Sequence, residues 1–357
     1  MQRRLIDEIR AGGPMDVATY MTLAMAHRTA GYYATRDPLG SRGDFITAPE
    51  ISQMFGELVG AALAQAWIDM GAPPRALLVE LGPGRGTLMC DALRATRHLP
   101  GFHDALRLHL VESSPVLRAA QGRTLAASRP VWHEDLSTLP SDAPILLCAN
   151  EFFDVLPIRQ LVRTQQGVQE RRIAADDDGR LGFVLDPRTV TLPAGGTFPD
   201  SGIVEIAPAR DAQMAMVASR IAAQGGCCIV IDYGDLDLDG ADTLQAVRDH
   251  ARAEPLEDPG EADLSSHVAF RPLMEVVRSA GLSAYGPLPQ GVWLERLGIA
   301  MRFERLARDT SCEVRGALQS QLRRLVDGDQ MGILFKVMAA TSLSEPPAGF
   351  TSSECMS

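Results

Sequence analysis

Short apolar runs alternate with helix-like segments along much of this chain. The apolar runs are rich in leucine, isoleucine and valine, as buried parallel strands usually are. The predicted strands are 77–81, 106–111, 144–149 and 227–232, and the helices between them are 88–97, 115–125 and 209–224. Strands that alternate with helices predict an α/β fold, in which helices cover both faces of a parallel sheet.

A different pattern occupies residues 158–207, where short apolar and polar stretches alternate. The sequence Asp176-Asp177-Asp178-Gly179 is a strong turn signal between the stretches 170–175 and 181–185. We therefore predict a β-rich insertion with an antiparallel hairpin. After it, the sheet is expected to end with a helix near 272–279 and strands near 281–286 and 332–337, with helices at about 295–308 and 313–326 in the connection.

The first seventy residues precede the sheet. Two amphipathic helices are predicted at 1–10 and 16–28, with Asp16 or Thr19 as the cap of the second. A glycine- and aromatic-rich loop follows, and a helix is predicted at 55–70. The last seventeen residues are rich in serine, proline and small side chains, which predicts a flexible tail. The expected division is an extension at 1–70, a main domain at 71–157 and 208–340, the insertion at 158–207 and the tail at 341–357.

Composition narrows the range of functions. The formal net charge of −11, from 34 basic and 45 acidic residues, argues against a nucleic-acid partner, because phosphate binding needs a basic surface. No apolar stretch approaches the ~20 residues of a membrane span, and no signal peptide is evident. We therefore expect a cytoplasmic protein. The six cysteines lack C-x-x-C spacing and the seven histidines lack metal-ligand spacing, so no metal site is expected.

The most informative motif follows the first predicted strand. Glu80 and Leu81 lead into Gly82-Pro83-Gly84-Arg85-Gly86. Glycines there allow a sharp turn and let a ligand approach the backbone. A dinucleotide fingerprint would place its third glycine at position 87, which is threonine. The spacing looks like the first motif of class I S-adenosylmethionine (AdoMet) methyltransferases, and the alternative is an ordinary glycine-rich turn.

Polar residues also follow the later predicted strands. Glu112 ends the second strand, where an acid can accept hydrogen bonds from the two hydroxyls of a ribose. Asp135 comes after the next helix, where its carboxylate and the neighbouring backbone could hold an adenine amino group. Asn150 directly follows the predicted strand at 144–149. Ligands of such sheets bind beyond the carboxyl ends of the strands, so these residues predict an adenosine-containing ligand.

Several blocks, in order over residues 1–340, resemble the MidA family. They are Gly31-Tyr32-Tyr33, Gly43-Asp44-Phe45 with Thr47-Ala48-Pro49-Glu50, Glu80 to Leu88, Asn150-Glu151-Phe152-Phe153-Asp154 with Pro157-Ile158, Ile231-Asp232-Tyr233-Gly234, Pro259-Gly260, Gln290-Gly291 and Met331-Gly332 with Leu334-Phe335-Lys336-Val337. The block at 263–270 departs from the family pattern, which usually has aspartate at the position of Ala269.

The resemblance implies a Rossmann-like class I methyltransferase with AdoMet as cofactor. Mitochondrial members of that family are complex I assembly factors that methylate protein arginine. The substrate implied here is therefore a protein, in particular a respiratory complex I subunit or its bacterial counterpart, and a homodimer is left open. The residues expected to bind the cofactor are Glu80, Gly82, Gly84, Gly86, Glu112, Ser113, Asp135, Leu136, Asn150, Gly43 and Thr47.

Arginine methylation would require carboxylates beside the acceptor. They can pair with the N–H groups of the protonated guanidinium and orient one nitrogen toward the methyl group. Glu151 and Asp154 follow the predicted strand at 144–149, and Asp44 lies in the long loop near the N-terminus. We predict these three as catalytic residues, with Asp232 and Tyr233 as second candidates. The alternatives are a hydrogen bond from Glu151 to the cofactor and a helix cap at Asp154.

Three functions remain open on the sequence alone. The first is an AdoMet-dependent protein arginine methyltransferase. The second is an AdoMet-binding assembly factor that acts as a scaffold for a partner without turnover. The third is a nicotinamide-dependent oxidoreductase, which the glycine spacing disfavours.

Overall fold

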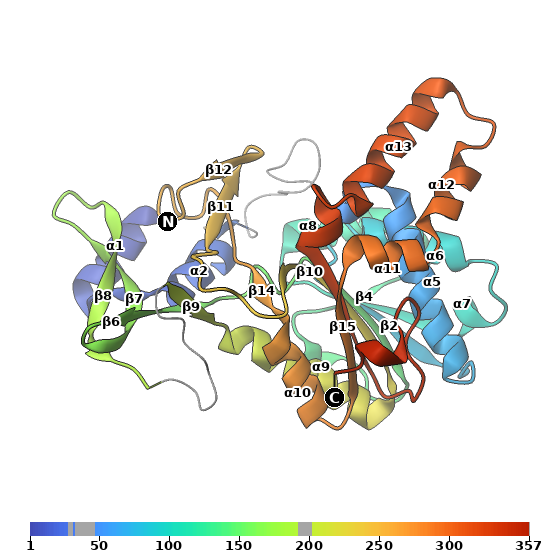
Figure 1. Ribbon diagram of the computed structural model, residues 1–357, viewed down its shortest axis with the longest axis horizontal. Coiled ribbons are helices and arrows are strands. Elements are labelled where there is room, and N and C mark those ends of the chain that lie inside the picture. The colour runs from blue at the N-terminus through green and yellow to red at the C-terminus, as the bar shows by residue number, and fades with distance from the viewer. Residues whose placement is uncertain (28–30, 33–46, 192–201, 357) are drawn as a thin grey trace. The chain divides into compact units, whose positions relative to one another are not determined.

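The predicted parallel sheet is present in the structure, a computed structural model (Figure 1). Its strands lie in the order β15-β16-β10-β5-β2-β3-β4. Neighbours from β10 to β4 are parallel, whereas β16 is antiparallel to both β10 and β15. The bounds are β2 Ala76–Leu81, β3 Leu106–Val111, β4 Val131–His133, β5 Ile145–Asn150, β10 Gly226–Asp235, β15 Ser283–Pro289 and β16 Phe335–Thr341. All residues of β2 and β5 are buried, as their apolar sequences require.

The structure describes residues 1–27, 31–32, 47–191 and 202–356. The chain divides into two compact units. The first unit comprises Met1–Phe45, Asp154–Ala212 and Asp237–Val268, and the second comprises Ile46–Phe153, Gln213–Leu236 and Ala269–Ser357. The parallel strands β2 to β5 lie in the second unit. The domain boundaries expected from the sequence stay a prediction.

The second unit also contains helices. They are α4 Ala48–Ile51, α5 Gln53–Asp69, α6 Thr87–Thr96, α7 Phe102–Ala105, α8 Pro115–Thr124, α10 Phe270–Ser279, α11 Gln290–Arg296, α12 Ile299–Ala307, α13 Cys312–Val326 and α14 Met331–Leu334. Helix α9, Pro208–Gln224, begins in residues of the first unit and ends in residues of the second. At Gly60 of α5, a Cβ would lie 2.5 Å from the Cα of Ala92 in α6. Glycine therefore allows these two helices to pack closely.

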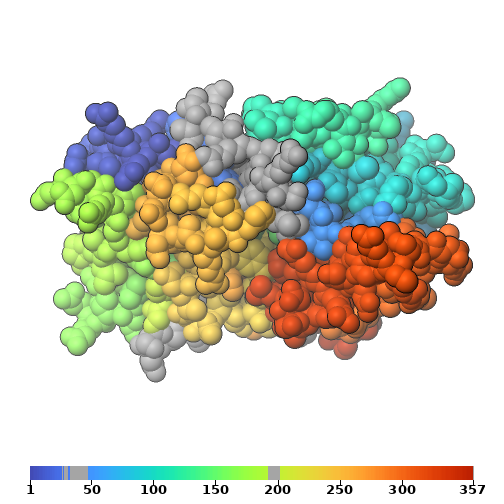
Figure 2. Space-filling model, turned by 90° about the horizontal axis from the view of Figure 1, so that it is seen from above, coloured from blue at the N-terminus to red at the C-terminus, as the bar shows by residue number. Residues whose placement is uncertain are grey.

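The connection before the last strand differs from its prediction. The single helix expected at 295–308 is two helices, α11 and α12, separated at Gly298, whose φ of 90° is left-handed. The strand expected at 332–337 begins only at Phe335, because residues 331–334 form the short helix α14. Helices α12 and α13 extend beyond the sheet (Figure 1), and they form part of the surface of the second unit in Figure 2.

The prediction of a flexible tail at 341–357 was wrong. The indole N–H of Trp293 donates to the carbonyl of Ala348 over 3.1 Å, and the amide of Met356 donates to Ala284 over 2.9 Å. Phe350 is buried, and a turn of 3-10 helix at Ser352–Glu354 begins with a capping box. The composition predicted a solvated segment, but one aromatic residue and a few backbone hydrogen bonds anchor it to the second unit.

Antiparallel strands dominate the first unit. One sheet has the order β1-β7-β6-β9, with β8 paired to β7, and another has the order β12-β11-β13. The bounds are β1 Met15–Asp16, β6 Arg159–Thr164, β7 Gly167–Ala175, β8 Leu181–Thr189, β9 Ile203–Ile206, β11 Gln245–Arg248, β12 Ala251–Ala253 and β13 Asp263–Ser265. The two-residue strand β14, Val268–Ala269, pairs instead with β10. The predicted hairpin with its turn at Asp176–Gly179 is thus confirmed as β7 and β8.

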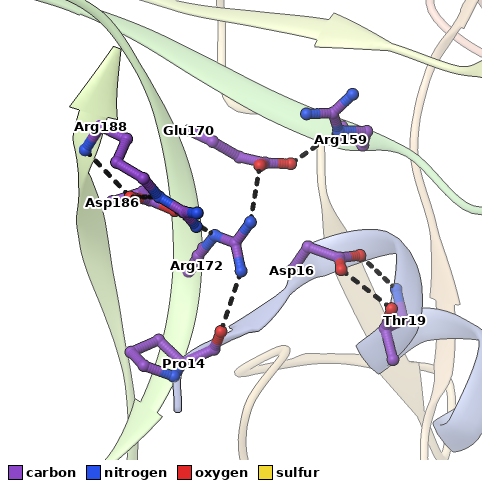
Figure 3. A network of polar contacts seen from close by, with 8 residues as sticks. All are labelled: Pro14, Asp16, Thr19, Arg159, Glu170, Arg172, Asp186 and Arg188. Carbon is purple, nitrogen blue, oxygen red and sulfur yellow. Dashed lines mark hydrogen bonds and ion pairs between the residues drawn. The ribbon is translucent and has the colours of Figure 1, made fainter. Parts of the chain in front are cut away.

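Two N-terminal helices, α1 Gln2–Gly12 and α2 Val17–Ala26, belong to the first unit. Asp16 caps α2 by accepting the amide of Thr19 over 2.7 Å, as one of the two predicted caps (Figure 3). Figure 3 also shows Arg172, which donates to the carbonyl of Pro14 and pairs with Glu170 and Asp186. The segment before α2 is thereby tied to β7.

Candidate functional site

The glycine loop between β2 and α6 has the backbone conformation that its sequence predicts. The φ angles of Gly82, Gly84 and Gly86 are 59°, 53° and 81°, all in the left-handed region. A Cβ at Gly82 would lie 2.9 Å from Cδ2 of Phe152. Side chains at these positions would therefore strain the backbone, and one at Gly82 would also crowd its neighbour. The loop presents main-chain atoms at the carboxyl end of β2, directly before a helix N-terminus.

The strand register brings three predicted residues to the same edge of the sheet. Leu81 is paired with Val111 of β3 and with Ala149 of β5. The next residues along these strands are therefore Gly82, Glu112 and Asn150. Because the three strands are parallel, their carboxyl ends meet there, as ligand binding in such a sheet requires.

Glu112 is held by a network that includes an unpredicted residue. Its Oε1 accepts the amide of Ser114 over 2.8 Å, and its Oε2 accepts Nε2 of Gln121 over 3.2 Å. Gln121 is fully buried and also donates to the carbonyl of Gly84 over 2.7 Å. Burial raises the pKa of Glu112. Gln121 thus links the acid of β3 to the glycine loop. In the sequence, Gln121 is only one polar residue of the predicted helix at 115–125, so it was not predicted as a site residue.

Glu80 is a buried acid directly beneath the glycine loop. It is 3% exposed, and its Oε2 has no hydrogen-bond partner among the described residues. Burial, reinforced by the nearby charge of Glu112, raises the pKa of Glu80 to about 8. A buried carboxyl oxygen without a partner is costly. A ligand that brings a hydrogen-bond donor or a positive charge would remove this cost, so the pair of acids suits a cationic nucleoside.

The loop after β4 contains the predicted adenine contacts. The carboxylate of Asp135 accepts the amide of Ser137 over 2.7 Å and its hydroxyl as well, and these hydrogen bonds lower the pKa of Asp135. Leu136 is buried, whereas Ser113 near the end of β3 is exposed. Arg220 of α9 donates to the carbonyls of Ser137, Leu139 and Pro140 and holds this loop.

The turn after β5 places Glu151 and Asn150 next to each other. The Nδ2 of Asn150 donates to Oε1 of Glu151 over 3.0 Å, and the amide of Ala48 donates to the same oxygen over 3.2 Å. Glu151 has a φ of 51°, and its own amide donates to the carbonyl of Ile231. The carboxylate of Glu151 is thus bound to the first residue of α4. Thr47 is the N-cap residue of that helix, without a side-chain cap hydrogen bond.

The other acids have different places. Asp232 is fully buried; its two carboxylate oxygens accept the amides of Phe153 and Tyr233, so it fixes the turn after β5. Asp154 belongs to the first unit and is also buried. Gly43 and Asp44 lie outside the described residues.

The described residues contain no group of three or more His, Cys, Asp or Glu side chains placed to hold a metal ion. In the described part of the chain, no helix is both long and apolar enough to cross a membrane.

Known proteins with similar sequences point to the same ligand. A family model described as "Putative S-adenosyl-L-methionine-dependent methyltransferase" matches residues 58–288. "Protein arginine methyltransferase NDUFAF7, mitochondrial" of Homo sapiens is 35% identical over an alignment that covers 95% of this chain and 82% of the relative. The Drosophila melanogaster homolog is also 35% identical, and 95% of this chain and 84% of that one are covered.

One similar protein has been solved with a ligand bound. A Burkholderia thailandensis protein crystallised with bound S-adenosyl-homocysteine matches this fold with a TM-score of 0.84. It is 25% identical, and the match covers 100% of this chain and 95% of that chain.

Proposed function

Because this chain belongs to the family of S-adenosylmethionine-dependent methyltransferases, we propose that it methylates an arginine side chain of a protein. The observation that carries this proposal is its similarity, over 95% of its length, to relatives named protein arginine methyltransferase. That similarity extends beyond the cofactor-binding strands into the first unit, which the family model covers only in part.

The residues at the carboxyl edge of the sheet fit AdoMet. The left-handed glycines leave the loop at 82–86 without side chains at the points of approach, and Glu112 can accept hydrogen bonds from ribose hydroxyls. We assign to Glu80 the cationic amino group of the cofactor, because its buried Oε2 lacks a partner among the described residues. We assign Asp135, Leu136 and Asn150 to the remaining contacts with the cofactor. When bound, the cofactor supplies a methyl group already activated by a sulfonium.

The acceptor side of the reaction needs orientation more than activation. We assign Glu151 and Asp154 to the guanidinium, with Asp44 as a further candidate outside the described residues. Carboxylates there would pair with two N–H groups and hold the third nitrogen toward the methyl carbon. The position of Glu151 supports this role, because hydrogen bonds from Ala48 and Asn150 fix its carboxylate in place.

The substrate and place of action are further parts of the proposal. The family resemblance implies a subunit of respiratory complex I or its bacterial counterpart. Action in the cytoplasm is consistent with the six cysteines, which are all free thiols.

The test is transfer from labelled AdoMet to that subunit by the purified full-length chain, followed by amino-acid analysis for methylarginine. We expect label on arginine. Glu151→Gln and Asp154→Asn should each lower turnover by about 100-fold or more, with cofactor affinity measured separately by calorimetry. Label on another residue type would contradict the arginine assignment. Variants that keep full biological activity without turnover would favour a scaffold.

A further inference from the structure

Arg210 is the most deeply placed arginine among the described residues of the first unit, at 3% exposed. It lies in the first turn of α9, where the helix dipole disfavours a cation. A buried guanidinium also destabilises the folded chain unless its N–H groups find acceptors. Neither helix formation nor apolar packing explains arginine at this position, so its contacts must.

The guanidinium of Arg210 joins two separate segments of the chain. Its Nη1 donates to the carbonyl of His267 over 2.7 Å. Its Nη2 lies 3.0 Å from the carbonyl of Ser266, 2.7 Å from the hydroxyl of Ser266 and 3.1 Å from the carbonyl of Asp154. The amide of Ser266 donates to the same Asp154 carbonyl over 3.0 Å. The main chain at Asp154 is therefore fixed from two directions.

The segment that Arg210 holds is itself anchored to the sheet of the first unit. The amide of His267 donates to Oγ1 of Thr243 over 2.9 Å, and Thr243 in turn donates its hydroxyl to Glu205 of β9. The contact between Arg210 and Asp154 thus extends a hydrogen-bonded network that begins in β9.

We propose that Arg210 is a positioning residue for methyl transfer, which fixes the main chain of Asp154 and thereby the direction of its carboxylate. This inference rests on the proposed function, because it takes Asp154 as a contact of the acceptor guanidinium. Positioning of this kind matters because a displacement of about 1 Å can lower turnover by about 100-fold. Arg210 itself contacts main-chain carbonyls and a serine hydroxyl, so it acts through Asp154.

The planar fork of arginine is essential to this arrangement. Lysine keeps the charge, but its single ammonium cannot reach carbonyls from two nitrogen positions. We expect Arg210→Lys to lower kcat by about 10- to 100-fold, with the Kd for AdoMet unchanged within about twofold. Ser266→Ala removes one acceptor only and should lower kcat by a few-fold in a protein that folds normally.

The decisive measurement is a double-mutant cycle with Asp154→Asn. If Arg210 acts through Asp154, Arg210→Lys in the Asp154→Asn background should cost less than about threefold in kcat. Additive losses would overturn the inference, because a merely structural role predicts them. Arg172→Lys is the matched control: it is also in the first unit and also bonds a main-chain carbonyl, but its losses should appear in stability and not in kcat.

Hydrogen exchange separates this inference from the proposed function. In Arg210→Lys, the amide of Ser266 should exchange at least about tenfold faster, whereas Arg172→Lys should leave it protected. If the unaltered protein transfers no methyl group to arginine, the proposed function fails, and the positioning role for methyl transfer fails with it. Unchanged protection of Ser266 alongside normal arginine methylation would overturn the inference alone.

Discussion

Replacing Glu80 with a residue that cannot ionise should stabilise the cofactor-free protein and weaken its binding of AdoMet. The substitution is Glu80→Gln, which keeps the size of the side chain and removes its charge. Glu80 is 3% exposed, and one of its carboxyl oxygens lacks a partner among the described residues. Burial and the charge of Glu112 raise its pKa to about 8. The folded protein therefore holds a proton on Glu80 at a pH where the unfolded chain has lost it.

The sign and size of the effect follow from this difference in proton binding. Between the ordinary glutamate value near 4.5 and about 8, the folded state binds one more proton than the unfolded state. The free energy of unfolding then falls as pH rises, by at most about 1.4 kcal/mol per pH unit from this group. Glu80→Gln lacks this dependence. Its stability relative to the unaltered protein should therefore rise by up to about 4 kcal/mol between about pH 5 and about pH 8.

Urea unfolding of the cofactor-free proteins at about pH 5, 6.5 and 8 measures this difference. Glu57→Gln is the matched control, because Glu57 is similarly buried but accepts hydrogen bonds from Arg94 and Arg302. Glu57→Gln takes the carboxylate away from Arg302 and leaves Arg94 with Asp91 as its acid partner, so it should destabilise the protein by about 3 kcal/mol. A Glu80→Gln variant that is no more stable than the unaltered protein at the highest pH, or a difference that does not grow with pH, would refute the reasoning.

The remaining predictions concern the glycine loop, a buried histidine and the C-terminal segment. Gly82→Ala places a methyl group 2.9 Å from Phe152 at a left-handed φ, so calorimetry should show at least about tenfold weaker AdoMet binding; unchanged affinity would contradict the close approach. Burial lowers the pKa of His109 to about 4. The free energy of unfolding should therefore fall by up to about 3 kcal/mol as the pH falls from about 6.5 toward 4. His109→Gln should reduce this fall in acid unfolding curves. Truncation after residue 347 removes Phe350 and a hydrogen-bond acceptor of Trp293, and should lower the free energy of unfolding by about 2–4 kcal/mol; an unchanged urea midpoint would indicate a dispensable tail.

The central strands of the parallel sheet could be predicted because burial alone determines where apolar residues occur along them. A strand buried in the middle of a sheet is rich in apolar residues, and 106–111, with leucine or valine at four of its six positions, was predicted with the bounds that β3 has in the structure. Glycines at 82, 84 and 86 have left-handed φ angles that other residues rarely adopt. The family and cofactor implied by these motifs are confirmed by the similarity to known methyltransferases.

Errors occurred where long-range contacts decide the structure. The tail at 341–357 has the composition of a solvated segment, yet Phe350 is buried and Trp293 bonds its backbone. The strand expected from residue 332 begins at Phe335, since a helical turn precedes it. Local propensity contains no information about a partner far away in the chain, so these segments could not be assigned from their own sequences.

The sequence alone determined which polar residues follow each buried strand, because the period of apolar residues and the positions of glycine are local properties. Only the tertiary structure decided what each of these residues does. Asp232 and Glu151 both lie near the carboxyl ends of apolar strands, but the carboxylate of Asp232 accepts the amides of Phe153 and Tyr233, whereas that of Glu151 accepts the amide of Ala48 at the start of α4. Likewise, Gln121 and Arg210 gained their roles from carbonyls far away in the chain. Hydrogen bonds of this kind depend on how the folded segments meet, which no pattern within one segment records.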